Sequence, residues 1–360
     1  MNVLALVTDA FGARGGIAKF NRDLLTAVAA DPRVSKVTVV PRGPYDSSEV
    51  LPANVEYITP ARRGKIGFSL AAGRTAWKMR PDVVLCGHIN LLPLASLLAS
   101  ATGASLIALS YGVEVWKDRG FAYRAALRRA KLVISISELT RNRLLEWSKT
   151  QFALVSILPP SVDLAQYGIG AKRADLLHRY DLAGRTVLLT TARLTVEDRY
   201  KGIDEVLDVL PSLVADKPDL AYLIVGDGDD RQRLVDKAKH LGLAERVVFA
   251  GYVPENEKAD HFRLADAFVM PGRGEGFGIV YLEALACGVP VIASALDASR
   301  EAVLHGALGQ VVNPDDPAEL RAAILTAIGD RERRIPPGLE HFSTSRFNER
   351  VAAVLSRVSG

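Results

Sequence analysis

Short apolar runs alternate with helical stretches along the whole chain of 360 residues. This alternation is typical of parallel β-sheets whose strands are joined by helices, and it predicts a doubly wound α/β fold. In the first half we expect strands centred on residues 5, 38, 57, 84, 107, 134 and 155, and in the second half on residues 189, 223, 248, 269, 292 and 311. The two halves repeat an architecture without repeating a sequence.

A pair of prolines at 159–160 interrupts this alternation between the halves. Proline has no backbone N–H to give to a sheet, and the residues from there to Gly184 are expected to form a linker with one short helix. A chain of this length, with 49% hydrophobic residues, can bury two separate cores. We therefore predict one domain at residues 1–165, a second at residues 166–344, and an amphipathic C-terminal helix within residues 345–360.

A glycine-rich loop follows the apolar strand expected at 267–271 and leads directly into a helix. Glu275 lies in this loop and Glu283 in the helix. Glycines allow a ligand to approach the backbone, and the free N–H groups of a first helical turn attract an anion such as a diphosphate. Both carboxylates would repel that anion, so they are better suited to accept hydrogen bonds from hydroxyl groups on either side of it. A ligand with hydroxyls at both ends and phosphates between them is a nucleotide sugar.

Two basic residues follow the expected strand at 186–190, namely Arg193 and Lys201. Open parallel sheets bind ligands beyond the carboxyl ends of their strands. A departing nucleoside diphosphate needs its growing negative charge neutralised, and two fixed cations can do this without a metal ion. The alternative for either residue is a solvated surface charge.

An acidic segment at 227–230 offers a rival way to hold a diphosphate, through a divalent metal ion bound by Asp227 and Asp229. It precedes a helical stretch, and the chain already supplies two cations, so we expect a turn and a helix N-cap instead. The six histidines show no metal-ligand spacing. We therefore expect no metal site and no cofactor other than the substrate.

Taken together, these segments resemble the retaining glycosyltransferases of family 4, whose signature is a pair of glutamates separated by seven residues. The resemblance implies the GT-B fold, with two Rossmann-like domains facing a cleft that holds the active site. It implies that Glu275 contacts the donor sugar, that Glu283 holds the ribose hydroxyls, and that Arg193 and Lys201 stabilise the departing diphosphate.

Further donor contacts follow from the same resemblance. The N–H groups of Phe277, Gly278 and Ile279 would complete the diphosphate cradle. In this family a paired glycine in the first loop, here Gly15 and Gly16, approaches the donor phosphates and the acceptor. By itself this loop is a weak signal, because it matches neither the G-x-G-x-x-G nor the P-loop fingerprint.

The base would be read by backbone groups near Val253, in the loop 251–256. The segment 197–204 is similar to that of bacterial mannosyltransferases of polysaccharide or glycolipid assembly, which makes GDP-mannose the first choice of donor and a UDP-sugar the second. A carboxylate such as Glu255 could favour guanine, which offers an N1–H and an exocyclic amine that uracil lacks.

One segment departs from the family pattern, which usually reads His-Gly-x-Asp/Glu. Tyr111 stands where the histidine is expected, and Glu114 follows it. A phenol can donate a hydrogen bond but is a poor base near neutral pH. The resemblance marks Tyr111 and Glu114 as contacts for the acceptor or the sugar. The alternative is an aromatic at a strand end, packed against Trp116.

The net charge of +4 is unevenly distributed, since residues 1–165 carry +9 and residues 166–360 carry −5. Basic residues gather at Arg62, Arg63 and Lys65, and again in a segment with interfacial aromatics at 119–131. Such a segment can bind an anionic membrane surface or a lipid-diphosphate acceptor, or it can be a solvated helix face. Because no nucleic-acid-binding motif accompanies the charge, we expect no nucleic acid partner.

A stretch free of Asp, Glu, Lys and Arg runs from residue 83 to residue 113. We expect it to split into a buried helix at 90–100 and a buried strand at 104–109. Neither part reaches the roughly 20 residues that span a bilayer, so we do not expect a transmembrane segment here. No secretory signal is visible at the N-terminus. Cys86 and Cys287 lie in apolar contexts and are expected to be buried thiols in a reducing cytosol.

The sequence therefore predicts a retaining, metal-independent glycosyltransferase of the cytoplasm, peripheral on the inner face of the cytoplasmic membrane, that moves a hexose to a lipid-linked or polysaccharide-precursor acceptor. A sugar epimerase or dehydrogenase is disfavoured, because neither G-x-G-x-x-G after the first strand nor a Tyr-x-x-x-Lys pair is present. A non-catalytic nucleotide-sugar-binding protein remains an alternative, because it would use the same binding residues.

Overall fold

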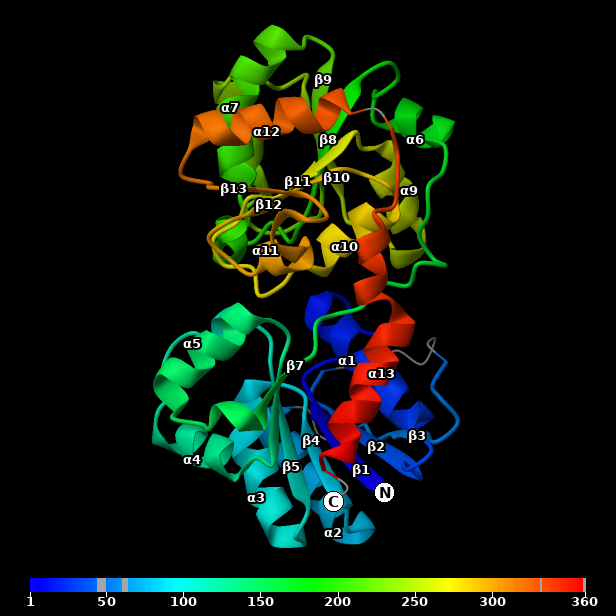
Figure 1. The fold of residues 1–360 in the computed structure, drawn as a ribbon, viewed down its shortest axis with the longest axis vertical. Coiled ribbons are helices and arrows are strands. Elements are labelled where there is room, and N and C mark those ends of the chain that lie inside the picture. The colour runs from blue at the N-terminus through cyan, green and yellow to red at the C-terminus, as the bar shows by residue number, and fades with distance from the viewer. Residues whose placement is uncertain (44–49, 60–63, 331, 359–360) are drawn as a thin grey trace. The chain divides into compact units, whose positions relative to one another are not determined.

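The computed structural model describes residues 1–43, 50–59, 64–330 and 332–358. The chain divides into two compact units, each built on its own parallel sheet (Figure 1). Unit 1 comprises Met1–Ser161 together with Thr344–Gly360, and unit 2 comprises Val162–Ser343. Arg62 and Arg63, part of one predicted basic cluster, lie outside the described residues.

In unit 1 the described strands form a seven-stranded parallel sheet of order β3-β2-β1-β4-β5-β6-β7. They are β1 (Asn2–Val7), β2 (Lys36–Pro41), β3 (Val55–Tyr57), β4 (Val83–Cys86), β5 (Ser105–Ser110), β6 (Leu132–Ser135) and β7 (Val155–Ile157). The helices are α1 (Gly16–Ala30), α2 (Gly64–Met79), α3 (Leu92–Thr102), α4 (Phe121–Arg129), α5 (Glu138–Ser148) and α13 (Thr344–Ser356), with 3₁₀ turns η1 (Ile89–Leu91), η2 (Val113–Val115) and η3 (Phe152–Leu154). Each strand centre predicted for the first half lies in one of these strands.

In unit 2 the described strands form a six-stranded parallel sheet of order β10-β9-β8-β11-β12-β13. They are β8 (Thr186–Thr191), β9 (Leu220–Val225), β10 (Val247–Gly251), β11 (Ala267–Val269), β12 (Val291–Ser294) and β13 (Gln310–Val312). The helices are α6 (Ala174–Arg179), α7 (Ile203–Asp216), α8 (Arg231–His240), α9 (Lys258–Leu264), α10 (Ile279–Ala286), α11 (Ser299–Ala302) and α12 (Pro317–Gly329), with 3₁₀ turns η4 (Val196–Lys201), η5 (Glu255–Glu257), η6 (Leu304–Gly306) and η7 (Pro337–Phe342). The predicted strand centres of the second half are confirmed, and so is the single short helix α6 before Gly184.

Both sheets are buried on their two faces, as parallel sheets require. In unit 1, Leu4 and Leu6 of β1 share a core cluster with Phe68 of α2 and Leu92 of α3. In unit 2, a second cluster joins the strands to α7, α8 and α12. Both cysteines are buried and unbridged, as predicted. The doubly wound α/β prediction is thus confirmed in each half.

The uncharged stretch from residue 83 to residue 113 splits as predicted. It forms β4, η1, α3 and β5, and Gly103, with a left-handed φ of 74°, ends α3 before β5 begins. Across the described ranges, we find no helix with the length and apolar character needed to cross a membrane.

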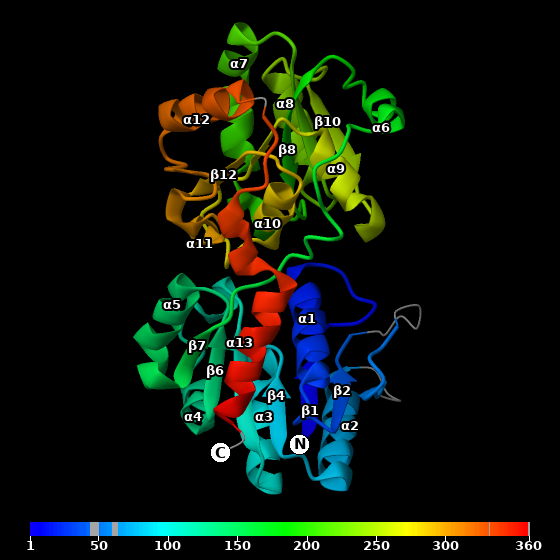
Figure 2. The same cartoon turned by 45° about the vertical axis from the view of Figure 1, so that its right-hand side comes forward.

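The C-terminal helix α13 belongs to unit 1 and runs beside α1 (Figure 2). Phe347 packs edge-on against Phe20 of α1, with 5.7 Å between ring centroids. At the other end of α1, the Arg33 guanidinium donates a hydrogen bond of 2.7 Å to the carbonyl of Ala352. The amphipathic helix predicted at the end of the chain therefore covers the first unit with its apolar face.

Candidate active site

The strand order of unit 2 reverses between β8 and β11, because the chain builds β9 and β10 on one side of β8 and β12 and β13 beyond β11. Ligands of open α/β sheets bind beyond the carboxyl ends of the strands at such a reversal. The loop after β8 carries Arg193 and Lys201, and the loop after β11 carries Glu275. The sheet topology therefore brings the two segments that carry the three residues predicted to be catalytic to the same edge of the sheet.

Lys201 and Glu275 form an ion pair, with 2.5 Å between Nζ and Oε2. Their side chains are only 15% and 17% exposed. Burial alone would lower the pKa of Lys201, but the carboxylate of Glu275 raises that pKa above its ordinary value. The lysine is therefore a fixed positive charge near neutral pH, held 74 residues away in sequence from its partner.

Packing inside the protein explains two of the loop glycines. A Cβ at Gly274 would approach the Tyr200 ring to 2.9 Å, and Gly278 has a φ of +88° with the Tyr281 ring where its Cβ would lie. The Arg273 N–H also donates to the carbonyl of Tyr200, at 2.8 Å. The loop after β11 thus lies directly on η4, and this close packing brings Glu275 to Lys201.

Helix α10 starts at this loop without a side-chain cap. No described residue accepts a hydrogen bond from the backbone N–H groups of Phe277, Gly278 or Ile279. Unpaired N–H groups at a helix N-terminus favour an anion. These three residues, predicted to cradle a diphosphate, therefore present donors next to Glu275.

Arg193 lies on the same loop as Lys201 but points into solvent. Its side chain is 75% exposed, and its Nε lies 3.0 Å from Oδ2 of Asp198. Asp198 is buried and also accepts from the hydroxyl of Thr195 at 3.1 Å. Arg193 is thereby tethered to Asp198, and among the described residues it makes no ion pair with Glu275.

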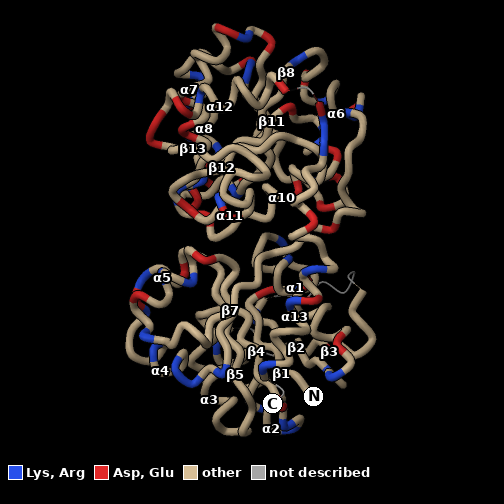
Figure 3. Tube along the Cα trace, viewed as in Figure 1, with Lys and Arg blue, Asp and Glu red and all other residues tan. Residues whose placement is uncertain are grey.

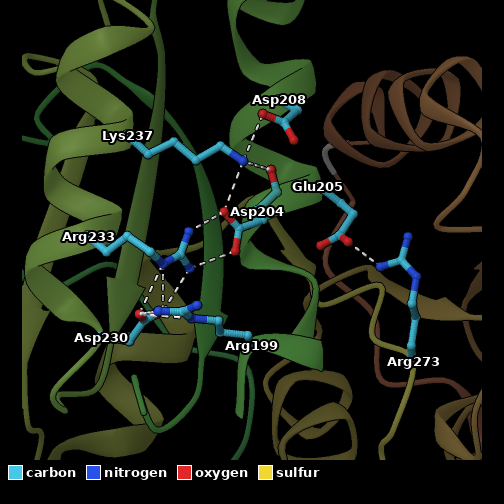
Figure 4. A network of polar contacts seen from close by, with 8 residues as sticks. All are labelled: Arg199, Asp204, Glu205, Asp208, Asp230, Arg233, Lys237 and Arg273. Carbon is cyan, nitrogen blue, oxygen red and sulfur yellow. Dashed lines mark hydrogen bonds and ion pairs between the residues drawn. The ribbon is translucent and has the colours of Figure 1, made fainter. Parts of the chain in front are cut away.

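A chain of charges runs from η4 across α8 to α7 (Figure 4). We call it the charge ladder, and its members are Arg199, Asp230, Arg233, Asp204, Lys237 and Asp208. Members of the ladder line a small depression together with Arg193 and Asp198. Since Arg199 is two residues from Lys201, the ladder anchors the turn that carries the predicted catalytic lysine.

Asp230 is the centre of the ladder. It is 3% exposed and accepts from Arg199 Nε at 2.9 Å and from Arg233 Nε at 2.9 Å, while its own N–H donates to the carbonyl of Leu194 at 2.8 Å. The hydrogen bonds from Arg233 above all lower the pKa of Asp230 to about 2.

The acidic segment 227–230 forms the predicted turn, and its last residue, Asp230, is the N-cap of α8. The Asp230 side chain makes no capping hydrogen bond, because two arginines occupy it. Asp227 accepts from the Gly228 N–H and Asp229 from the Val196 N–H. Among the described residues, no three His, Cys, Asp or Glu side chains are grouped to hold a metal ion.

Two site residues escaped the sequence analysis. Lys258, at the start of α9, lies 3.1 Å from both carboxylate oxygens of the fully buried Glu283. Asp297, also fully buried, accepts from the Glu275 N–H at 2.9 Å and from the Ser299 hydroxyl. Neither residue was assigned a role in the site from the sequence, because both pairings join residues more than 20 positions apart.

Val253, the predicted contact for the base, is buried in the loop between β10 and η5. Glu255 follows in η5, half exposed, with an oxygen 3.2 Å from Lys258 Nζ. The Lys258 ammonium therefore pairs with both Glu283, predicted to hold the ribose, and Glu255, predicted to favour guanine.

The remaining predicted contacts belong to unit 1. Gly15, with a φ of 94°, is the N-cap of α1, and Gly16 is its first residue; a Cβ at either would meet no atom within 4 Å. Tyr111 is buried, with its hydroxyl 2.7 Å from Asn21 Oδ1, and Glu114 accepts from the Tyr111 N–H at 2.6 Å. Both polar groups thus have partners inside the unit.

A family model and several known proteins are similar to this chain in sequence. The family model for glycosyl transferases group 1 matches residues 183–335. The GDP-mannose-dependent alpha-(1-6)-phosphatidylinositol monomannoside mannosyltransferase of Mycolicibacterium smegmatis is 40% identical over 262 residues, covering 69% of this chain and 66% of that protein. The protein of the same name from Mycobacterium tuberculosis is 35% identical over 270 residues, covering 71% and 69%.

Solved structures show the fold. Anabaena HepE in complex with UDP and glucose matches with a TM-score of 0.78 over 98% of this chain and 99% of that one, at 21% identity. WaaG, a glycosyltransferase involved in lipopolysaccharide biosynthesis, matches with a TM-score of 0.72 over 98% and 99%, at 18% identity. The GT-B fold class predicted from the sequence is confirmed.

Proposed function

The chain belongs to the glycosyl transferases group 1 family, and from this premise we propose that it transfers mannose from GDP-mannose to a hydroxyl group of a lipid-linked acceptor. We propose further that the transfer retains the anomeric configuration and requires no metal ion. The observation that carries the proposal is the Lys201–Glu275 ion pair beside the uncapped start of α10. A UDP-sugar-dependent transferase and a non-catalytic nucleotide-sugar-binding protein are the alternatives.

In the proposed reaction the diphosphate oxygen leaves the anomeric carbon, and its negative charge grows in the transition state. Lys201 and Arg193 would neutralise that charge, together with the N–H groups at the start of α10. Glu275 would orient the sugar through its hydroxyls. Since no side chain is an evident covalent nucleophile, the acceptor hydroxyl oxygen would bond to the anomeric carbon on the face that the diphosphate leaves, and the hydroxyl proton would pass to the departing diphosphate oxygen.

Glu283 would contact the nucleoside, and Lys258 would balance the charge of Glu283. Glu283 is proposed to accept the ribose hydroxyls, and without a ligand it is neutralised by Lys258. A buried carboxylate needs such a partner, because an unpaired buried charge is strongly destabilising. Donor binding would then place the ribose hydroxyls beside carboxylate oxygens that already accept from Lys258.

The direct test is an assay with labelled GDP-mannose and vesicles that contain phosphatidylinositol, the acceptor class that the relatives' names specify. A mannolipid should form from GDP-mannose, and UDP-glucose serves as the comparison donor. The mannolipid should still form in excess chelator. Complete loss of activity that added metal restores would contradict metal independence. Binding of GDP-mannose without turnover on any acceptor of a membrane extract would favour the non-catalytic alternative.

Nucleotide preference tests the donor. GDP should compete for the site better than UDP, because Glu255 can accept from guanine N1–H and the exocyclic amine. Glu255→Gln should weaken GDP binding by about 1 kcal/mol or more, roughly fivefold upward, and leave UDP binding unchanged. Isothermal titration of both nucleotides measures this difference.

Glu257→Gln is the matched control, since Glu257 lies on the same 3₁₀ turn and, among the described residues, Lys258 pairs with Glu255 and Glu283 instead. It should leave both affinities unchanged. Tighter binding of UDP by the native protein, with UDP-sugars alone consumed, would refute the mannosyl assignment and leave the transferase assignment standing.

Peripheral association with the inner face of the membrane is also proposed, and unit 1 offers two surfaces for it. Three arginines lie on α4, the helix of the predicted segment 119–131, where Phe121 is 78% exposed (Figure 3). Helix α2 exposes Ile66, Leu70 and Trp77 and contains no Asp or Glu. Basic helices with apolar side chains in solvent suit an anionic lipid surface.

Sedimentation with anionic vesicles should therefore remove the protein from solution at low salt and release it at high salt, because exposed charges are screened. Phe121→Ser tests α4, and the double substitution Ile66→Ser with Trp77→Ser tests α2. Binding to neutral vesicles of equal strength would contradict the electrostatic basis, and absence of binding to either would favour an acceptor free in solution.

A further inference from the structure

Unit 1 has its own topological reversal, and the same rule that locates Lys201 and Glu275 applies to it. The chain builds β2 and β3 on one side of β1 and then continues with β4 on the other. Ligands are therefore expected beyond the carboxyl ends of β1 and β4. The loop after β1 contains Gly15 and Gly16, and the loop after β4 contains His88, to which the sequence analysis gave no role.

The ring of His88 is held in one orientation. It is 8% exposed, and its Nδ1 accepts from the Asn90 N–H at 3.1 Å as the cap of η1. An accepting ring nitrogen carries no proton, so in the neutral ring the proton is on Nε2. Burial, and then the positive charges of Arg119 and Arg42, lower the pKa of His88 to about 4, which keeps the ring neutral near pH 7.

The neighbours that were predicted to contact acceptor or sugar already have hydrogen-bond partners inside the unit. The Tyr111 hydroxyl donates toward Asn21 and Gly87, and burial raises its pKa well above the ordinary range. The Glu114 carboxylate accepts from the Tyr111 N–H. His88 stacks on the Tyr111 ring, with 6.2 Å between centroids, and the described residues provide no partner for its Nε2.

We propose that His88 binds the acceptor, donating a hydrogen bond from Nε2 to a hydroxyl oxygen of a polyhydroxylated ring. Tyr111 and Glu114 then support the loop and the His88 ring instead of contacting the substrate. The inference rests on the proposed function, since a transferase needs an acceptor. It adds a specific contact in unit 1 that distinguishes acceptor binding from donor binding.

The test uses the full chain with labelled GDP-mannose and phosphatidylinositol vesicles. His88→Ala should lower kcat/KM for phosphatidylinositol roughly 10- to 100-fold, because one oriented hydrogen bond to the substrate is lost. GDP affinity, and the slow hydrolysis of GDP-mannose without acceptor, should stay within about twofold of the native values. His88→Gln keeps an N–H donor near the position of Nε2 and should recover a substantial part of the loss.

His240→Ala is the control for removing a histidine, since His240 is exposed on α8 and hydrogen-bonds only to the carbonyl of Asp236 among the described residues. Equal losses of transfer and hydrolysis in His88→Ala, or no rescue by Gln, would show that the residue acts through folding and overturn the proposal. Unchanged kcat/KM in His88→Ala would also overturn it. If the native chain neither hydrolyses nor transfers a nucleotide sugar, the proposed function itself fails. That result differs from a failure of the His88 proposal.

Discussion

Replacing Lys201 by alanine is expected to lower the kcat of glycosyl transfer by about 100-fold or more, because its charge would stabilise the diphosphate most in the transition state. A 100-fold loss corresponds to about 2.7 kcal/mol of activation free energy. The substitution also leaves Glu275 without its ion-pair partner, so the sugar contact would lose its fixed position. Steady-state kinetics at saturating donor measures the change.

Lys239→Ala is a matched control, because Lys239 is a lysine of α8 whose side chain is 61% exposed. It should leave kcat unchanged. Thermal melting should show that both variants remain folded. An unchanged kcat for Lys201→Ala at saturating donor would remove the residue from the proposed mechanism.

Removing the centre of the charge ladder is expected to affect both stability and turnover. Asp230→Ala removes the carboxylate that pairs with Arg199, and among the described residues it leaves Arg233 paired with Asp204. We expect a loss of about 2 kcal/mol, because a buried carboxylate with several charged donors is removed, and hence a melting temperature lower by about 4–8 °C. Since η4 is then less firmly held, kcat should fall by roughly tenfold, while GDP affinity changes less.

Asp236→Ala is the control for this experiment, since Asp236 lies on the same helix α8 and its side chain is 51% exposed. The pH dependence follows from the lowered pKa of Asp230. Its stabilisation is complete above the ordinary carboxyl value of 3.8 and is lost as the pH falls through about 2. A melting temperature of Asp230→Ala equal to that of the native protein at pH 7 would contradict the anchoring role.

Much of the fold was predictable, because parallel strands buried on both faces are continuous apolar runs that differ plainly from the helices between them. All thirteen expected strand centres lie in observed strands. The split of the uncharged stretch at Gly103 was also readable, since glycine adopts the left-handed conformation that ends α3. Neighbouring residues were therefore sufficient to predict where the strands lie and where α3 ends.

The partners of individual charges were not predictable in this way. The acidic segment 227–230 was expected to supply the cap of α8, and Asp230 does hold the N-cap position. Tertiary structure brings Arg199 from another element to it, and charge-assisted hydrogen bonds to two guanidiniums are stronger than one to a backbone N–H. The competing contact was thus invisible from residues 227–230 alone.

By itself, the sequence determined the alternating elements, the two parallel sheets and the order of Arg193, Lys201 and Glu275 along the second half. Only the tertiary structure decided which charges meet, pairing Lys201 with Glu275 and Lys258 with Glu283. It also decided that Tyr111 points into the core, where its hydroxyl meets Asn21. The physical reason is that strand and helix patterns are written in neighbouring residues, whereas an ion pair depends on the strand order of the sheet, which brings distant loops to the same edge.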